Sequence, residues 1–279
     1  MKKLIIIFST NTYFMKPFIF LLIAAITFGC KNKSNSEVET TTIDASTTHN
    51  NDGNDVAKKG LTIYPIDHAS MVLQWDDVTI YVDPVGGKDL YSKYSTPNVI
   101  LITDIHADHL NSETLDSVAG EGTNIIAPKA VYEKLTEELR SKMEVVANGF
   151  TITNSGISIE AIPMYNLRKE ALQFHPKGRG NGYVLEKNGK RIYISGDTED
   201  IPEMRNLKDI EIAFVCMNLP YTMPMEKAAE AVLDFKPKSV YPYHFRGEDG
   251  FSDVEKFKKI VENENPDIEV ILADWYSRK

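Results

Sequence analysis

The sequence predicts an α/β protein in which two mixed sheets pack face to face with helices outside, a four-layer α/β/β/α sandwich. Short β-branched runs begin at Leu61 and recur at close spacing. Two blocks of strands are each followed by a segment in which strands alternate with helices. The 279 residues, 42% apolar and 25% charged, have an ordinary globular composition. We expect one folded domain over residues 60–279.

The first half of this domain opens with closely spaced strands. Strands are predicted at 61–64, 71–75, 78–82, 98–102 and 124–126. Residues 75–78 form a hairpin turn between the second and third strands. Helices are predicted from about Ser112 and over 129–142, and the second helix would bury one apolar face made by Val131, Leu135 and Leu139.

The second half repeats this order without visible sequence similarity. Strands are predicted at 156–162, 182–186, 191–194, 212–215, 239–241 and 269–272. Helices are predicted at 226–235 and 252–263. The two halves would therefore each supply one sheet and its outer helices.

The first thirty residues have the composition of an export signal. Residues 18–28 are apolar or small, lysines precede them, and no acidic residue occurs before Cys30. This apolar segment is too short to span a bilayer. It ends Ala-Ile-Thr-Phe-Gly-Cys30, which resembles a bacterial lipobox whose cysteine is lipidated. We expect an exported lipoprotein anchored to a membrane of the bacterial envelope, periplasmic or at the outer surface. A simple cleaved signal and a start at Met15 are alternatives.

Residues 31–59 are rich in Ser, Thr, Asn and Asp, which predicts a disordered tether. Beyond Cys30 the only cysteine is Cys216, so no internal disulfide is available. Three lysines and no acidic residue precede residue 30, so removing residues 1–29 moves the formal charge from −9 to −12. Such an acidic protein is not expected to bind nucleic acid.

The stretch TDIHADHLN, residues 103–111, concentrates ligand-type side chains directly after the strand 98–102. Strand ends lie at the rim of the sheets, where α/β folds bind ligands. Alternation would send Asp104, His106 and Asp108 to one side, and the turn before the helix would bring His109 to a second focus. Imidazole and carboxylate suit a zinc ion. A helix cap would explain only one aspartate.

The same stretch resembles the His-x-His-x-Asp-His signature of the metallo-β-lactamase superfamily, with Asp104 in place of the first histidine. Tyr-Val-Asp83-Pro, Ser-Gly-Asp197-Thr and Tyr-Pro-Tyr-His244 match further landmarks in the same order. The resemblance implies the metallo-β-lactamase-type sandwich over residues 60–279. It also implies that Asp83 orients the histidine loop, that Asp197 bridges metals, and that His244 is the last ligand.

Two metal positions follow from this resemblance. The second position keeps all its ligand types, and we expect it to bind one divalent cation firmly, Zn²⁺ in the first instance, through Asp108, His109, Asp197 and His244. The first position is weakened, because its ligands are Asp104, His106 and Asn166. These oxygen-rich ligands would suit Mn²⁺ or Fe²⁺ better than Zn²⁺ as a second ion.

Three other residues are expected beside the ligands. His175, in the glycine-rich loop 174–182, is a substitute ligand, a proton donor, a substrate contact or an ordinary loop histidine. His68 opens a stretch similar to the branch that includes ascorbate-6-phosphate lactonase, and it either supports the site or is a satisfied core histidine. Arg179 belongs to a set of cationic side chains, namely Arg168, Lys169, Lys177, Arg179 and Arg246. This set either favours an anionic substrate or consists of ordinary solvated charges on a loop.

The chemistry implied is metal-assisted hydrolysis, because a zinc-type ion polarises a carbonyl or phosphoryl oxygen and lowers the pKa of bound water from 15.7 to roughly 7. Asp104 or Asp108 would orient the attacking water, and His175 is the third catalytic candidate. We expect a hydrolase of a small anionic ester, lactone, amide or phosphoester. The alternative is a non-catalytic metal-binding or ligand-binding protein on a degenerate hydrolase fold. A β-lactamase in the strict sense is less favoured.

Overall fold

The computed structural model describes residues 48–49, 56–58 and 60–276. They belong to one compact unit, Ala45–Lys279. The predicted signal, Cys30 and most of the predicted tether lie outside the described residues. Within the described residues no helix is both long and apolar enough to span a bilayer.

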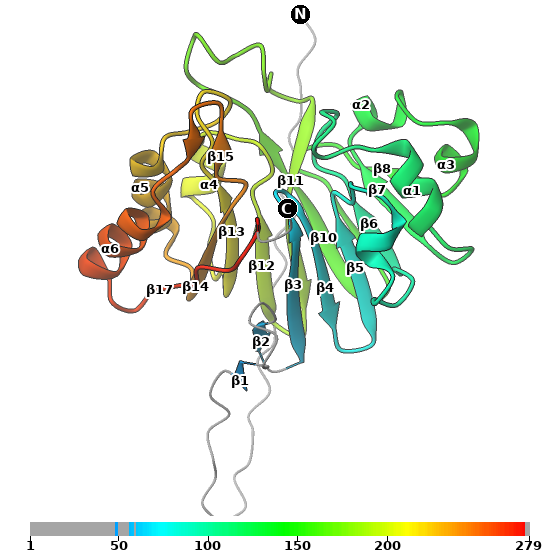
Figure 1. The fold of residues 1–279 in the computed structure, drawn as a ribbon, viewed down its shortest axis with the longest axis horizontal. Coiled ribbons are helices and arrows are strands. Elements are labelled where there is room, and N and C mark those ends of the chain that lie inside the picture. The colour runs from blue at the N-terminus through cyan, green and yellow to red at the C-terminus, as the bar shows by residue number, and fades with distance from the viewer. Residues whose placement is uncertain (1–47, 50–55, 59, 277–279) are drawn as a thin grey trace, which may run out of the picture. The chain divides into compact units, whose positions relative to one another are not determined.

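Two sheets form the body of the fold (Figure 1). The first has eight strands in chain order, β1 (Thr48–His49), β2 (Val56–Lys58), β3 (Leu61–Asp67), β4 (Ser70–Trp75), β5 (Val78–Val82), β6 (Val99–Leu101), β7 (Asn124–Ala127) and β8 (Met143–Val145). The second has the order β17 (Glu269–Val270), β14 (Ser239–Tyr243), β13 (Ile212–Cys216), β12 (Lys190–Ile194), β11 (Gly180–Lys187), β10 (Ile157–Met164), β9 (Thr151–Asn154). A small hairpin joins β15 (Arg246–Gly247) to β16 (Gly250–Phe251).

Helices cover the outer faces of both sheets (Figure 1). The first sheet carries η1 (Lys88–Tyr91), α1 (Ser112–Val118), α2 (Lys129–Tyr132) and α3 (Glu137–Ser141). The second carries α4 (Pro202–Arg205), α5 (Met225–Phe235) and α6 (Val254–Glu264). The predicted four-layer sandwich is confirmed.

Alternation along the strands of the first sheet divides its side chains between two cores. Ile80 and Val99 enter the core shared with the second sheet, whereas their neighbours Tyr81 and Ile100 enter the core beneath the helices. Strand β13 is buried along its whole length because it lies inside the second sheet with α5 outside it.

The single helix predicted over 129–142 is wrong, because two short helices occupy this stretch. Thr136 has an extended backbone and its hydroxyl accepts a hydrogen bond from the backbone N–H of Leu139, so it starts a new helix. Val131, Leu135 and Leu139 are nevertheless buried together as expected. The buried face predicted from the hydrophobic pattern is correct. The helix boundaries within 129–142 depend instead on the N-cap at Thr136.

The topology brings loops from both sheets together at one rim. Strands β5, β6 and β7 are parallel, as are β12, β13 and β14, so each set ends at one edge of its sheet. Asp83, His109, Asp197 and His244 follow β5, β6, β12 and β14 respectively. Backbone φ angles of 52°, 43° and 47° place His68, Asp83 and His244 in the left-handed region. Such conformations cost free energy and persist only where the surrounding structure holds them, and they are found mainly at functional sites.

Candidate metal centre

Asp83 is the buried anchor of the site. Its carboxylate accepts hydrogen bonds from the backbone N–H of Thr103 at 2.7 Å and from the Thr103 hydroxyl at 2.6 Å. His109 Nδ1 lies 2.8 Å from the same carboxylate. A carboxylate can only accept here, so Nδ1 carries a proton, and Nε2 is the nitrogen that would release its proton and offer a lone pair to a metal. This is the orientation of a metal-binding imidazole backed by a carboxylate.

The structure brings together the four side chains expected at the second metal position. His109 Nε2 is 3.4 Å from Asp197 Oδ2 and 3.9 Å from Asp108 Oδ1. His244 Nε2 is 3.4 Å from Asp197 Oδ1 and 3.3 Å from Asp108 Oδ2. Two carboxylates and two imidazoles from three different loops therefore surround one small space, and His109, Asp197 and His244 offer ligand atoms that all lie within 4.8 Å of one another.

The residues present fit a divalent cation. His109 Nε2, Asp197 Oδ1 and both ring nitrogens of His244 are buried without a hydrogen-bond partner. Buried polar atoms in native proteins are almost always satisfied, so this concentration of exceptions needs an explanation. Nitrogen and carboxylate oxygen in a four-ligand set are the donors that zinc accepts.

Opposed charges control protonation in the metal-free site. Burial would lower the pKa of His109, but the carboxylates of Asp197 and Asp83 outweigh burial and raise this pKa well above its usual value. Burial raises the pKa of Asp197, and the charges of His244 and His109 more than reverse this. Burial raises the pKa of Asp108 as well, but the nearby imidazoles of His244 and His68 more than reverse this and hold that pKa far below its usual value. The two aspartates are therefore ionised at neutral pH.

A second group of ligand atoms lies where the first metal position was expected. Asp104, His106 and His175 offer atoms within 4.8 Å of one another. His175 Nδ1 lies 3.1 Å from the carbonyl oxygen of Tyr221, which can only accept, so Nε2 presents its lone pair. That Nε2 is 3.2 Å from Asp197 Oδ2 and has no hydrogen-bond partner. His175 therefore has the orientation of a ligand although it comes from a loop.

Asn166 supports this loop instead of completing the group. Its amide nitrogen donates hydrogen bonds to the carbonyl oxygens of Ala171 and Tyr221 at 2.9 and 2.7 Å. Its backbone N–H donates to the carbonyl oxygen of His175 at 2.9 Å. The sequence offered only the glycine-rich composition of the loop as a signal that His175 would reach the position expected for Asn166.

Alternation did not place Asp108 beside Asp104 and His106 as expected. Strand β6 ends at Leu101, and the backbone N–H groups of His109 and Leu110 both donate to the carbonyl oxygen of His106, which closes a turn. The turn moves Asp108 to the side of His244. Asp108 is 42% exposed and lines the pocket, whereas Asp104 is fully buried with both oxygens bound by Arg179. Of these two aspartates, only Asp108 can contact water in the pocket.

His68 lies against the second position. Its Nε2 is 3.4 Å from Asp108 Oδ2, and its ring centroid is 3.8 Å from that of His244. Its Nδ1 is 2.8 Å from the hydroxyl of Tyr276, which also accepts from the backbone N–H groups of Phe245 and Arg246. No sequence motif predicted that Tyr276 would contact His68. The contact arises only from the tertiary structure, in which residues far apart in the sequence lie side by side.

A pocket of about 380 Å³ opens over the cluster, lined by His106, Asp108, Phe174, His175, Asp197, Asn218 and Tyr221. Its lining contains no lysine or arginine. Of the cations expected around it, Arg168 binds Glu199 at 2.8 Å and Lys177 binds Glu203 at 2.9 Å. These two charges are neutralised by neighbouring acids, so they add little to the attraction of an anion.

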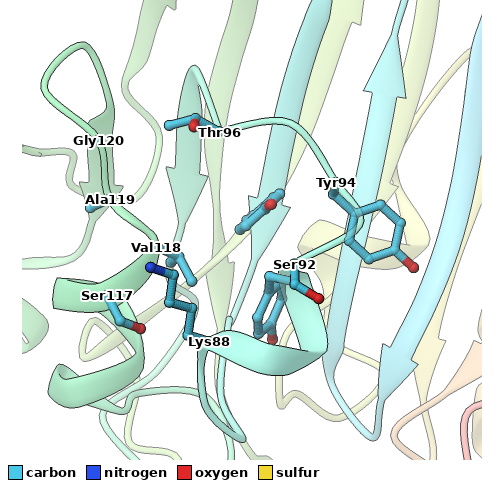
Figure 2. Close-up of a pocket in the computed structure, with 10 residues that line it drawn as sticks. Lys88, Ser92, Tyr94, Thr96, Ser117, Val118, Ala119 and Gly120 are labelled. Atoms are coloured by element: carbon cyan, nitrogen blue, oxygen red, sulfur yellow. The ribbon is translucent and has the colours of Figure 1, made fainter.

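Another hollow, of about 260 Å³, lies beside η1 and the end of α1 (Figure 2). Its lining consists of Tyr81, Lys88, Tyr91, Ser92, Tyr94, Thr96, Ser117, Val118, Ala119 and Gly120. The Tyr81 hydroxyl donates to the carbonyl oxygen of Ser95, and burial raises its pKa to about 12. With no histidine, cysteine or carboxylate in its lining, this hollow lacks the groups needed for acid–base or metal chemistry at neutral pH.

Comparison with known proteins agrees with the geometry. A family model for the β-lactamase superfamily domain matches residues 62–244, a span that begins before His68 and ends at His244. A UPF0173 metal-dependent hydrolase of Pyrococcus abyssi is 27% identical over 197 residues, covering 65% of this chain and 84% of that protein. Another from Methanopyrus kandleri is 25% identical over 217 residues, covering 74% and 94%.

Solved structures give the same result. A candidate metal-dependent hydrolase from Parabacteroides distasonis is 38% identical with a TM-score of 0.69, and the match covers 83% of this chain and 98% of that one. Igni18, a metallo hydrolase from Ignicoccus hospitalis, is 22% identical with a TM-score of 0.64, covering 77% and 95%. The second likeness shows the fold alone.

Replacing Asp83 by Asn should weaken metal binding by about 10- to 100-fold, because His109 loses the carboxylate that fixes its tautomer. Competition with a chromophoric chelator measures this affinity. Asp77→Asn is the matched control, since Asp77 is exposed and pairs with Lys187. Equal affinities for the wild type and Asp83→Asn would show that this carboxylate does not support a ligand.

Metal affinity should rise with pH between pH 6 and 8. The pKa of His109 is raised in the metal-free protein, so the ion must displace a proton from Nε2, and this competition weakens as pH increases. The apparent dissociation constant should fall by up to about tenfold per pH unit. The same chelator assay in constant ionic strength measures it. A constant affinity over this range would contradict the predicted protonation of His109.

Proposed function

Since the chain belongs to the β-lactamase superfamily, we propose that it is a metal-dependent hydrolase of a small ester, lactone, amide or phosphoester. The observation that carries this proposal is the set of buried, unpartnered ligand atoms of His109, Asp197 and His244 beneath an open pocket. A protein gains nothing from such atoms unless a cation binds them.

Each residue of the cluster has a distinct part in the proposed reaction. A bound divalent cation supplies Lewis acidity toward a carbonyl or phosphoryl oxygen and acidifies water. Asp83 retains the proton on His109 Nδ1, so that Nε2 remains a ligand. Asp108 is ionised and partly exposed, and its carboxylate accepts a hydrogen bond from the attacking water and orients it. His175 lines the same pocket, and its Nε2 lone pair would accept the proton released by the attacking water and pass it to the leaving group.

The pocket supports a small substrate. Its volume of about 380 Å³ is at the lower end of the range for ligand pockets, and Phe174 and Tyr221 provide an aromatic wall at 5.2 Å between ring centroids. The Asn218 side chain adds a polar group. An anionic substrate would be attracted mainly by the bound cation, because Arg168 and Lys177 are already paired with acidic side chains. The resemblance of the stretch that begins at His68 to the branch that includes ascorbate-6-phosphate lactonase favours lactones among these classes.

A metal-binding protein without turnover is the second candidate. One observation favours it, since the Arg179 guanidinium binds Asp104 inside the first metal position and leaves one position for an ion. Many hydrolases work with one ion, so the enzyme remains the better-supported reading.

His109→Ala should remove both metal and turnover. The variant loses an imidazole ligand, and we expect at least about 100-fold weaker metal binding and no hydrolysis of a panel of esters, lactones, amides and phosphoesters. Glu203→Gln is the control, because Glu203 contacts Lys177 and the Tyr165 hydroxyl and none of the expected metal ligands. Wild-type protein that holds metal but hydrolyses nothing in the panel would favour the binding protein, and turnover by metal-free protein would refute the hydrolase.

We also propose that the protein is exported and held to a membrane through lipidated Cys30. Cys30→Ala in the full chain should move it from the membrane fraction to the soluble fraction and abolish labelling by radioactive palmitate. Cys216→Ala is the control, since Cys216 is buried in the folded domain. Unchanged membrane association of Cys30→Ala would exclude this anchor.

A further inference from the structure

The first metal position has its ligands but also a resident cation. Asp104 stands where the superfamily signature has its leading histidine, and its side chain is fully buried. His106 and His175 lie close enough to share an ion with it. Three converging ligands of this kind would ordinarily attract a second divalent cation.

Arg179 fills that place. Its Nε donates to Asp104 Oδ1 at 3.1 Å and its Nη2 donates to Asp104 Oδ2 at 2.9 Å, so the guanidinium forms a two-pronged pair with the carboxylate. Nη2 also donates to the carbonyl oxygen of Phe174, which fixes the side chain against its own loop. Arginine stays charged at every accessible pH, so this cation is permanent.

His106 also contacts both Asp104 and Arg179. Its Nδ1 lies 2.7 Å from Asp104 Oδ2, so Nδ1 carries the proton and Nε2 holds the lone pair. That lone pair faces Arg179 Nη2 at 3.4 Å. Both lone-pair groups that a metal would use, on Asp104 and on His106, are therefore turned toward the guanidinium.

We propose that Arg179 is a built-in substitute for the first metal ion, so that the protein binds one divalent cation per chain. This inference rests on the proposed metal-dependent function. A guanidinium and a divalent cation cannot share these ligands, because both are positive and both need the same lone pairs. Asp104 and Arg179 form a matched pair, since a neutral histidine at 104 would leave the partly buried guanidinium without a counter-charge.

The pair also explains why Asp104 tolerates full burial. A buried carboxylate without a partner is strongly unfavourable, and the two-pronged guanidinium supplies charge and hydrogen bonds at once. A lysine could not reproduce both contacts, because its ammonium is a point charge without the planar fork. The geometry therefore requires arginine specifically.

Metal counting tests the proposal. The wild type, saturated with Zn²⁺ and freed of excess by desalting, should contain one ion per chain by elemental analysis. The double variant Asp104→His/Arg179→Met removes the resident cation and restores an imidazole, and it should contain two. Lys177→Met is the matched control from the same loop and should contain one, because Lys177 pairs with Glu203 instead.

The outcomes separate this inference from the proposed function. Two ions in the wild type would overturn the inference and leave the hydrolase intact. No ion in the wild type would overturn both. Circular dichroism checks that the double variant is folded, and a folded double variant that still holds one ion would overturn the inference. If the double variant does not fold, Arg179→Gln takes its place with the same expected count of two, and one ion in it would overturn the inference.

Discussion

The rest of the site depends on the free-energy cost of burying ligand atoms without partners. His109 Nε2, His175 Nε2, Asp197 Oδ1 and His244 Nε2 are all buried and have no hydrogen-bond partner. Each such atom costs roughly 1 to 3 kcal/mol. Three of these residues, His109, Asp197 and His244, offer ligand atoms within 4.8 Å of one another, where a bound cation would remove this cost.

Backbone conformation at the rim carries a related cost. His68, Asp83 and His244 all have left-handed φ angles, a conformation that residues other than glycine rarely adopt. The strain is held by surrounding bonds, since the backbone N–H of His244 donates to the carbonyl oxygen of His68 and Asp83 is fixed by Thr103. These residues therefore keep a backbone conformation that is locally unfavourable, and in return their side chains lie at the metal centre.

The sequence was informative where short-range rules apply. Strand positions and the buried face shared by Val131, Leu135 and Leu139 followed from alternation and periodicity. Tertiary contacts were beyond these rules. His175 reaches the cluster because the backbone N–H of Asn166 binds the carbonyl oxygen of His175, and Tyr276 reaches His68 across 208 positions of sequence. Neither contact leaves a local pattern in the chain.

The two sheets meet at the metal centre as well as in the core. Asp108 and His109 follow β6 of the first sheet, whereas Asp197 and His244 follow β12 and β14 of the second. A cation held by all four would join the two halves of the sandwich. Binding to the folded state alone stabilises it, by about 2.7 kcal/mol when the free ion is at 100 times its dissociation constant. Metal binding and sheet packing are thus coupled, because the ligands come together only when both sheets are in place.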